Sequence, residues 1–289
     1  MGTTSEIQWT DATWNIARGC TKVDADCKYC YMYRQSLNAT RYTPDQVTKT
    51  KSVFTLPLHY KETKSNCWTG KPLIFTSSLT DFFHEDIDGF RHEAWDIIRK
   101  CPHLIFQILT KRPERINDHL PADWGDGWDN VWIGTSIGHM DGIDRLMYLH
   151  GVKAKTKFLS LEPLHGELDL EYPESIFPNG PARCCSGRDC GCYGLPVDPP
   201  IIYGIDWVIV GGESGNENGK YKYRPCNLDW IERIVGTCKA YGVPVFVKQL
   251  GTHLANEMKL SDRHGGNINE FTESLQIREF PKMPLFDQH

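Results

Sequence analysis

Three cysteines lie in a short polar loop near the N-terminus, in the stretch ARGCTKVDADCKYCYMYR at residues 17–34. Cys20, Cys27 and Cys30 are spaced C-x6-C-x2-C, and their loop has no apolar periodicity that would place them in a core. Clustered thiolates of this kind bind zinc or an iron–sulfur cluster. A structural zinc site needs four ligands, and no fourth ligand follows in this loop. A cluster held by three thiolates instead keeps one iron open to a cofactor or substrate.

A second group of cysteines follows in the sequence RCCSGRDCGC, at Cys184, Cys185, Cys190 and Cys192. Four thiols in a glycine-containing loop suit a structural zinc ion or an auxiliary iron–sulfur cluster. The C-C-x4-C-x-C spacing is not that of a zinc ribbon, so the spacing does not decide which metal would bind. Cys226 is a further candidate ligand. Exposed thiols without a metal are the alternative reading. These cysteines are also the candidates to complete a zinc site with the N-terminal loop.

The composition is that of a globular protein with a substantial core. The chain has 289 residues, 40% of them hydrophobic and 24% charged, and no apolar run approaches the length of a membrane span. The polar N-terminus does not resemble a signal peptide, so we expect a cytoplasmic protein without membrane contact. Eleven cysteines in a reducing compartment favour metal ligation over disulfides. Cys101 directly follows one predicted helix and Cys238 lies within another, and both are expected in the core.

The net charge of −5 gives no overall attraction to nucleic acid. A local basic rim is nevertheless expected around the thiol loop, from Lys22, Lys28, Arg34 and Arg41.

Seven short runs rich in Val, Ile, Phe and Leu predict buried parallel strands, at residues 13–19, 71–78, 103–110, 130–137, 156–163, 206–213 and 243–250. Helices are predicted between them at 89–100, 113–119, 141–150 and 227–241. In the last helix, Asn227 is a good N-cap and Gly242 lies just past the end.

This alternation predicts an α/β fold, a parallel (β/α) barrel that is partial or near-complete, rather than a doubly wound open sheet. Residues 1–250 would form the barrel, with a Cys-, Pro- and Gly-rich insertion at 171–200. Residues 251–289 would be an irregular C-terminal extension packed on the barrel. Chemistry in such barrels takes place at the carboxyl ends of the strands.

Polar residues gather at those strand ends, namely Gln107, Thr110, Lys111, Arg112, Thr135, Ser136, Ser160, Glu162, Lys248 and Gln249. A single charged residue at a strand end usually belongs to a solvated loop, but several around one barrel mouth indicate a binding site. The alternative to a binding role is that a Lys and a Glu among these residues form a structural ion pair.

The thiol loop resembles that of the radical S-adenosylmethionine (SAM) superfamily, with Tyr29 as the aromatic residue before the last cysteine. The usual C-x3-C-x2-C spacing is lengthened here by three residues. A family of phage and bacterial proteins with this longer spacing is similar over nearly the whole chain, through EIQWTDATWNIARGCTKVDADCKYCY, SSLTDFFHED, LTKRPER, SLEPL, DWVIVGGESG, VFVKQ and LQIREFP. The resemblance implies a [4Fe-4S] cluster on Cys20, Cys27 and Cys30, whose open iron binds SAM and cleaves it to a 5′-deoxyadenosyl radical. It also implies an external electron donor of the flavodoxin or ferredoxin type.

The superfamily binds the SAM amino group with a polar motif after the second strand, where this chain has Ser77, Ser78 and Asp81. A strand end with a helix-capping aspartate is the alternative reading. The other expected cofactor contacts are Tyr29, Thr110, Lys111, Thr135, Ser136 and Glu162. The expected catalytic or substrate contacts are Gln107, Arg112, His84, Glu213, Lys248 and Gln249. His84 is a candidate proton donor, and Lys111 or Arg112 suits a carboxylate or phosphate.

The resemblance to phage proteins suggests a modified nucleotide or base in DNA as substrate, and most concretely the isomerisation of an amino-acid-bearing thymidine. In that case the enzyme would work in the host cytoplasm. Aromatic residues that could stack on a base are Tyr31, Tyr33, Phe82, Phe83 and Trp132, with core packing as the alternative. A radical SAM repair lyase or an RNA- or peptide-modifying enzyme stays open. From a different class, a zinc-stabilised nucleic-acid-binding barrel without redox chemistry also stays open.

Overall fold

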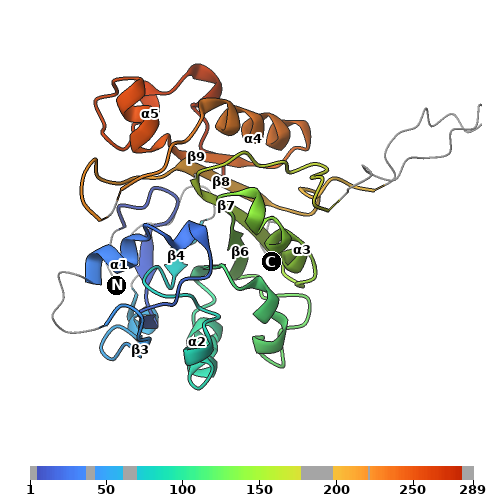
Figure 1. The fold of residues 1–289 in the computed structure, drawn as a ribbon. Coiled ribbons are helices and arrows are strands. Elements are labelled where there is room, and N and C mark those ends of the chain that lie inside the picture. Colours follow the sequence, from blue (N-terminus) through green and yellow to red (C-terminus); the bar gives the residue numbers. More distant parts are fainter. Residues whose placement is uncertain (1–4, 37–42, 61–69, 177–197, 221, 282–289) are drawn as a thin grey trace, which may run out of the picture.

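The computed structural model describes residues 5–36, 43–60, 70–176, 198–220 and 222–281. Its centre is one curled sheet of seven parallel strands, which forms a half-barrel with β1 and β9 at its edges (Figure 1). The order across the sheet is β1 (Ala12–Trp14), β4 (Leu73–Thr76), β5 (Ile105–Thr110), β6 (Val131–Ser136), β7 (Thr156–Leu164), β8 (Trp207–Gly212) and β9 (Val245–Gln249). Each predicted run forms one of these strands, so a partial barrel is confirmed.

The helices between the strands lie on the outer side of the sheet (Figure 1). They are α2 (Arg91–Lys100), α3 (Asp144–His150) and α4 (Leu228–Ala240). Asn227 caps α4 through its side chain, which accepts a hydrogen bond from the backbone N–H of Asp229, and Gly242 follows the helix with a φ of +67°. The predicted caps of this helix are therefore confirmed.

The helix predicted at 113–119 is wrong. This segment forms two short 3-10 turns, Pro113–Arg115 and Asn117–His119. The segment lies between Pro113 and Pro121, and so short a stretch gives too few i→i+4 hydrogen bonds to stabilise an α-helix.

Side chains alternate between the two faces of the sheet along each strand, and those on the concave face form two layers. The concave face carries large apolar residues near the start of the strands, among them Trp132, Phe158, Trp207 and Phe246. Further along, the inward positions at the carboxyl ends of these strands hold Ser136, Glu162, Glu213 and Lys248. Each is separated from the apolar residue of its strand by an even number of positions, so both point to the same face. The apolar layer closes the bottom of the half-barrel, and the polar layer lies above it at the carboxyl ends.

Three of the aromatic residues considered for base stacking are core residues instead. Phe82, Phe83 and Trp132 are fully buried. Phe82 packs against Trp95, with ring centroids 5.0 Å apart, and Trp132 packs against Trp207 at 5.8 Å. The stacking hypothesis is wrong for these three, because burial of their large apolar surface in the core leaves them no face for a ligand.

The thiol loop is followed by α1 (Tyr31–Ser36), and nearby β2 (Ala17–Arg18) pairs with β3 (Thr48–Lys49) in a small antiparallel ribbon. At the other end of the chain, α5 (Gly251–Glu257) follows β9 directly. The segment after it returns along β9, where Val247 donates to the carbonyl of Ile277 and Glu279 donates to that of Val245. This return covers a sheet edge that would otherwise expose unpaired backbone groups.

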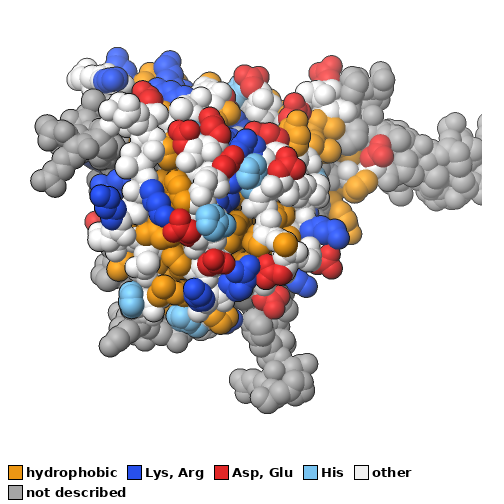
Figure 2. Space-filling view, turned by 90° about the horizontal axis from the view of Figure 1, so that it is seen from below, with side chains coloured by type: hydrophobic (Ala, Val, Ile, Leu, Met, Phe, Trp, Pro, Cys, Tyr) orange, Lys and Arg blue, Asp and Glu red, His pale blue; other side chains and the backbone are white. Residues whose placement is uncertain are grey.

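Positive and negative side chains are interspersed over the face seen in Figure 2, in keeping with the small net charge. In the part of the chain that the structure describes, no helix is long and apolar enough to cross a membrane.

The close contact between the end of β8 and the start of α5 yields a stability prediction. A Cβ added to Gly212 would lie 2.2 Å from the carbonyl oxygen of Leu250, so backbone would have to move. We expect Gly212→Ala to lower the free energy of unfolding by about 1–3 kcal/mol in chemical denaturation. Gly236 lies in α4 with open space around its Cα, so Gly236→Ala should raise stability by about 0.5–1 kcal/mol. Equal effects of the two variants would contradict this packing.

Candidate active site

The carboxyl ends of the strands and the thiol loop enclose a cavity of about 740 Å³. Its apolar floor includes Trp9, Phe75 and Leu109. Most of the residues singled out in the sequence line it, namely Cys20, Cys27, Tyr29, Cys30, Ser77, Ser78, Asp81, Thr110, Lys111, Arg112, Ser136, Ser160, Glu162, Glu213, Lys248 and Gln249. Strand ends more than 200 residues apart in sequence therefore meet the thiol loop at one place.

Three expected site residues are not part of the cavity lining. Thr135 is turned to the other face of β6, where its hydroxyl donates to the carbonyl of Thr110 at 2.9 Å. Gln107 lies one layer deeper, fully buried, with its side-chain amide donating to the carbonyl of Trp9. His84 is 1% exposed behind the thiol loop.

The thiol loop has little regular structure beyond a 3-10 turn at Ala25–Cys27, and three arginines from separate parts of the chain hold it. Arg112 follows β5, Arg145 belongs to α3, and Arg224 lies between β8 and α4. Each donates to a different part of the loop, as described below. Neither Arg145 nor Arg224 carries a local sequence signal, because each reaches the loop across more than 100 residues of sequence.

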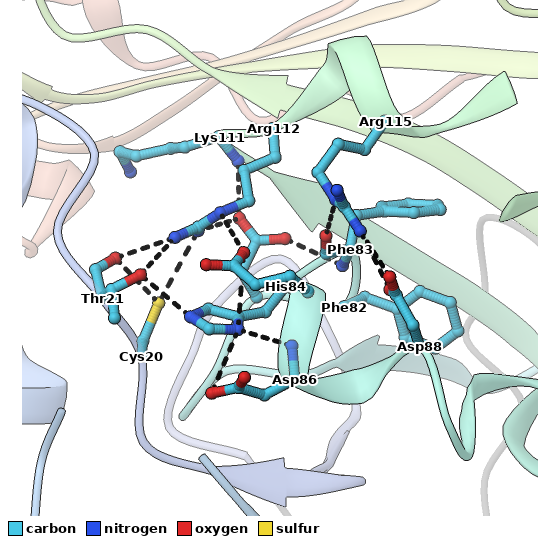
Figure 3. Close-up of polar contacts among 12 residues, drawn as sticks. Cys20, Thr21, Phe82, Phe83, His84, Asp86, Asp88, Lys111, Arg112 and Arg115 are labelled. Carbon is cyan, nitrogen blue, oxygen red and sulfur yellow. Dashed lines mark hydrogen bonds and ion pairs between the residues drawn. The ribbon is translucent and has the colours of Figure 1, made fainter. Parts of the chain in front are cut away.

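Arg112 reaches the first part of the loop (Figure 3). Its guanidinium donates to the hydroxyl and the carbonyl of Thr21, at 2.7 and 3.1 Å, and one Nη lies 3.9 Å from Sγ of Cys20. The same Nη lies 3.3 Å from Oδ2 of Asp81. Arg112 is only 7% exposed, so its donors are turned towards the protein.

Asp26 anchors the middle of the loop to the ends of β6 and β7. Its buried carboxylate accepts from His165 at 2.6 Å, from Arg145 at 3.1 Å and from the backbone N–H of Gly138 at 3.1 Å. Burial opposes ionisation, but the hydrogen bond from His165 and the charge of Lys111 prevail and lower the pKa of Asp26. Arg145 also pairs with Asp24, the N-cap of the turn, so the loop contributes two charged anchors.

Arg224 anchors the loop from the segment between β8 and α4. It forms a two-pronged pair with Glu213, at 2.8 and 2.7 Å, and donates from its remaining Nη to the carbonyl of Ala25 at 2.7 Å. Glu213 is 5% exposed, so its carboxylate serves chiefly to orient Arg224.

The segment after β4 contains one engaged carboxylate and one strained serine. Asp81 accepts from Phe83 N, Thr110 Oγ1, Lys111 N and Arg112, so both of its oxygens have protein partners. Ser77 is a non-glycine residue with a φ of +69°, is 3% exposed, and its hydroxyl has no hydrogen-bond partner among the described residues. Strained backbone beside a cavity is a mark of functional positions. Ser78 instead exchanges hydrogen bonds with Asn15.

Two lysines reach the polar layer. Lys111 donates to the hydroxyl of Ser136 at 2.9 Å, and Lys248 pairs with Oε2 of Glu162 at 3.1 Å. The Lys–Glu ion pair considered from the sequence is thus present. The other carboxylate oxygen of Glu162 is buried in the cavity wall and has no partner among the described residues.

The three thiols of the loop are half-buried. Burial raises the pKa of Cys20 to about 12, with the charge of Asp81 adding to the effect, and burial also raises the pKa of Cys30. As free thiols, Cys20 and Cys30 therefore stay protonated at neutral pH.

No three His, Cys, Asp or Glu side chains within the described ranges are grouped closely enough for a single metal ion. The second cluster, Cys184, Cys185, Cys190 and Cys192, lies outside the described residues. Cys226 is buried just before the N-cap of α4, where its thiol faces the carbonyl of Asn227. Cys101 and Cys238 are core residues, as expected.

A sequence model for proteins of unknown function (DUF5131) matches residues 4–281. The chain belongs to the DUF5131 family. No curated protein and no solved structure matches it. The DUF5131 description carries no activity.

The network around Asp26 gives a testable consequence. Asp26→Ala would leave the side chain of His165 and the backbone N–H of Gly138 without their acceptor and remove one partner of Arg145. We expect a loss of about 3 kcal/mol in unfolding free energy, measured by denaturant titration. Asp126, in an ion pair with Lys153 that is mostly exposed, is the matched control, and Asp126→Ala should change stability by less than about 1 kcal/mol. A similar loss in both variants would show that Asp26 is not an anchor.

His84 gives a pH dependence. Its Nδ1 accepts from the backbone N–H of Asp86 at 3.1 Å, which leaves Nε2 to donate to Thr21 at 2.9 Å and makes the ring neutral. Burial and the charge of Arg112 lower its pKa below the ordinary 6.5, so the unfolded state binds the proton more tightly. The contribution of His84 to the free energy of unfolding should therefore be fully present above pH 6.5 and be lost as the pH falls below it.

We expect His84→Gln to flatten this acid limb in urea titrations between pH 7 and pH 5. The exposed His92→Gln is the control and should retain the wild-type slope. An unchanged slope in His84→Gln would contradict the neutral, buried ring.

Proposed function

We propose that this chain is a radical SAM enzyme, with a [4Fe-4S] cluster held by Cys20, Cys27 and Cys30. The observation that carries the proposal is that all three thiols line the cavity at the carboxyl ends of the half-barrel strands. When bound, such a cluster with SAM would supply a 5′-deoxyadenosyl radical for hydrogen abstraction from the substrate. Thiolates on different irons are further apart than the ligands of one ion, which agrees with the absence of a single-ion group among the described residues.

The size and lining of the cavity support a bound small molecule. Its volume of about 740 Å³ falls within the ~300–1,000 Å³ of small-molecule sites. Three buried polar atoms of its lining have no partner among the described residues, namely Ser77 Oγ, Thr80 Oγ1 and Glu162 Oε1. Buried polar atoms are normally paired, so these three support a bound polar ligand.

The residues of the chain have distinct roles in this proposal. The free oxygen of Glu162 accepts a hydrogen bond from a bound molecule, and the hydroxyl of Ser77 accepts or donates one. Lys111 donates from its ammonium group to a carboxylate. Trp9 and Phe75, with ring centroids 4.6 Å apart, exclude water from the cavity floor. The partners of Asp81 lie within the protein, so we give it the role of orienting Arg112 and Lys111 rather than that of binding the SAM amino group.

We propose a modified nucleotide or base of DNA as the substrate, and an isomerisation of an amino-acid-bearing thymidine as its most specific form. The support is that Glu162 and Lys248 place an unpaired carboxylate oxygen beside an ammonium group, partners for the amino and carboxylate groups of such a side chain. Lys22 and Lys28 lie over the rings of Tyr33 and Tyr29 at the rim, where a phosphate would pass. The proposal requires a cytoplasmic setting with a flavodoxin- or ferredoxin-type electron donor.

The test is SAM cleavage. Protein reconstituted anaerobically with iron and sulfide, then reduced by dithionite, should form 5′-deoxyadenosine from SAM, detected by chromatography. Cys20→Ala, Cys27→Ala and Cys30→Ala should each abolish it, since each removes a cluster ligand. Cys101→Ala removes a buried thiol away from the cavity and should retain cleavage. A colourless wild-type protein that holds zinc and leaves SAM intact would contradict the proposal and favour a binding module.

A further inference from the structure

Arg112 contacts the sulfur of Cys20 in addition to its oxygen acceptors. A residue that only bound the carboxylate of a cofactor would not need this contact. One Nη of its guanidinium lies 3.9 Å from Sγ of Cys20, a distance compatible with a hydrogen bond to sulfur (Figure 3). The guanidinium stays charged at any pH at which the protein is folded. Its side chain is 9% exposed, so this charge acts on the sulfur with little screening by water.

The position of Arg112 is fixed from several sides. The other Nη donates twice to Thr21, the residue after Cys20, and Asp81 holds the Nη that faces the sulfur. Glu85 lies 3.7 Å from Nε. With these partners, Arg112 has little freedom to turn towards a ligand, and its direction towards Cys20 is built into the fold.

We propose that Arg112 sets the reduction potential of the cluster by donating a hydrogen bond and a fixed positive charge to the sulfur of Cys20. This inference rests on the proposed function. Hydrogen bonds to cluster sulfurs and nearby positive charge favour the reduced state, which carries one more negative charge. Arg112 therefore raises the potential, and Asp81 opposes it through its own negative charge while it orients the guanidinium.

The experiment is a potentiometric titration of the reconstituted cluster in the full chain, followed by electron paramagnetic resonance and visible absorbance. In Arg112→Gln, we expect the ratio of reduced to oxidised cluster at a fixed potential to fall at least tenfold, which is 59 mV for a one-electron couple. Arg112→Lys retains the charge and should shift the ratio less. Arg115 lies one turn away, bonded to Asp88 and the carbonyl of Phe83, and Arg115→Gln should titrate like the wild type.

Asp81→Asn tests the same idea with the opposite sign. Removal of the negative charge should raise the ratio of reduced to oxidised cluster, whereas general loosening of the loop would move Asp81→Asn and Arg112→Gln in the same direction. This variant also decides the matter if Arg112→Gln fails to hold a cluster.

The proposed function and the role of Arg112 are contradicted by different outcomes. A wild-type protein that assembles no cluster contradicts the proposed function. A wild-type cluster with an unchanged potential in Arg112→Gln, or equal shifts in the same direction in Arg112→Gln and Asp81→Asn, contradicts only the role of Arg112.

Discussion

The structure depends on the pairing of three arginines with an irregular loop. A loop with one 3-10 turn cannot hold its thiols in place by its own backbone hydrogen bonds, because ordering it costs entropy that such bonds do not offset. Arg112, Arg145 and Arg224 supply the missing contacts from the ends of the sheet. Each is at least partly buried and paired with a carboxylate, so none leaves an uncompensated charge.

The length of the thiol loop acquires a physical meaning from these contacts. The chain has three more residues between its first two cysteines than the C-x3-C-x2-C loop of the enzyme class that we propose for it. The lengthened spacer contains Asp24 and Asp26, which pair with Arg145 and attach the loop to the ends of β6 and β7. The longer spacer thus attaches the thiol loop to the barrel through these two carboxylates.

The sequence predicted what local patterns determine. Apolar runs predicted all seven strands, and the two-residue period of a strand explains why Ser136 and Glu162 line the cavity while Thr135 does not. It could not predict the partners of the thiol loop, because Asp26 and His165 are 139 residues apart and nothing local marks either of them as part of a pair. The helix expected at 113–119 did not form because the segment between two prolines is too short to support one. Phe82 is not available for stacking because it packs in the core, which its place in the sequence does not reveal.

The proposed function requires that the loop of Cys20, Cys27 and Cys30 carry a cluster with one iron open to SAM. The most direct measurement compares iron and acid-labile sulfide in wild type and in the triple variant Cys20→Ala/Cys27→Ala/Cys30→Ala, together with the paramagnetic resonance of the reduced proteins. The account predicts that wild type binds four more irons and four more sulfides per chain than the variant, and that SAM alters the wild-type signal. Equal iron contents, or a signal that SAM leaves unchanged, would contradict it.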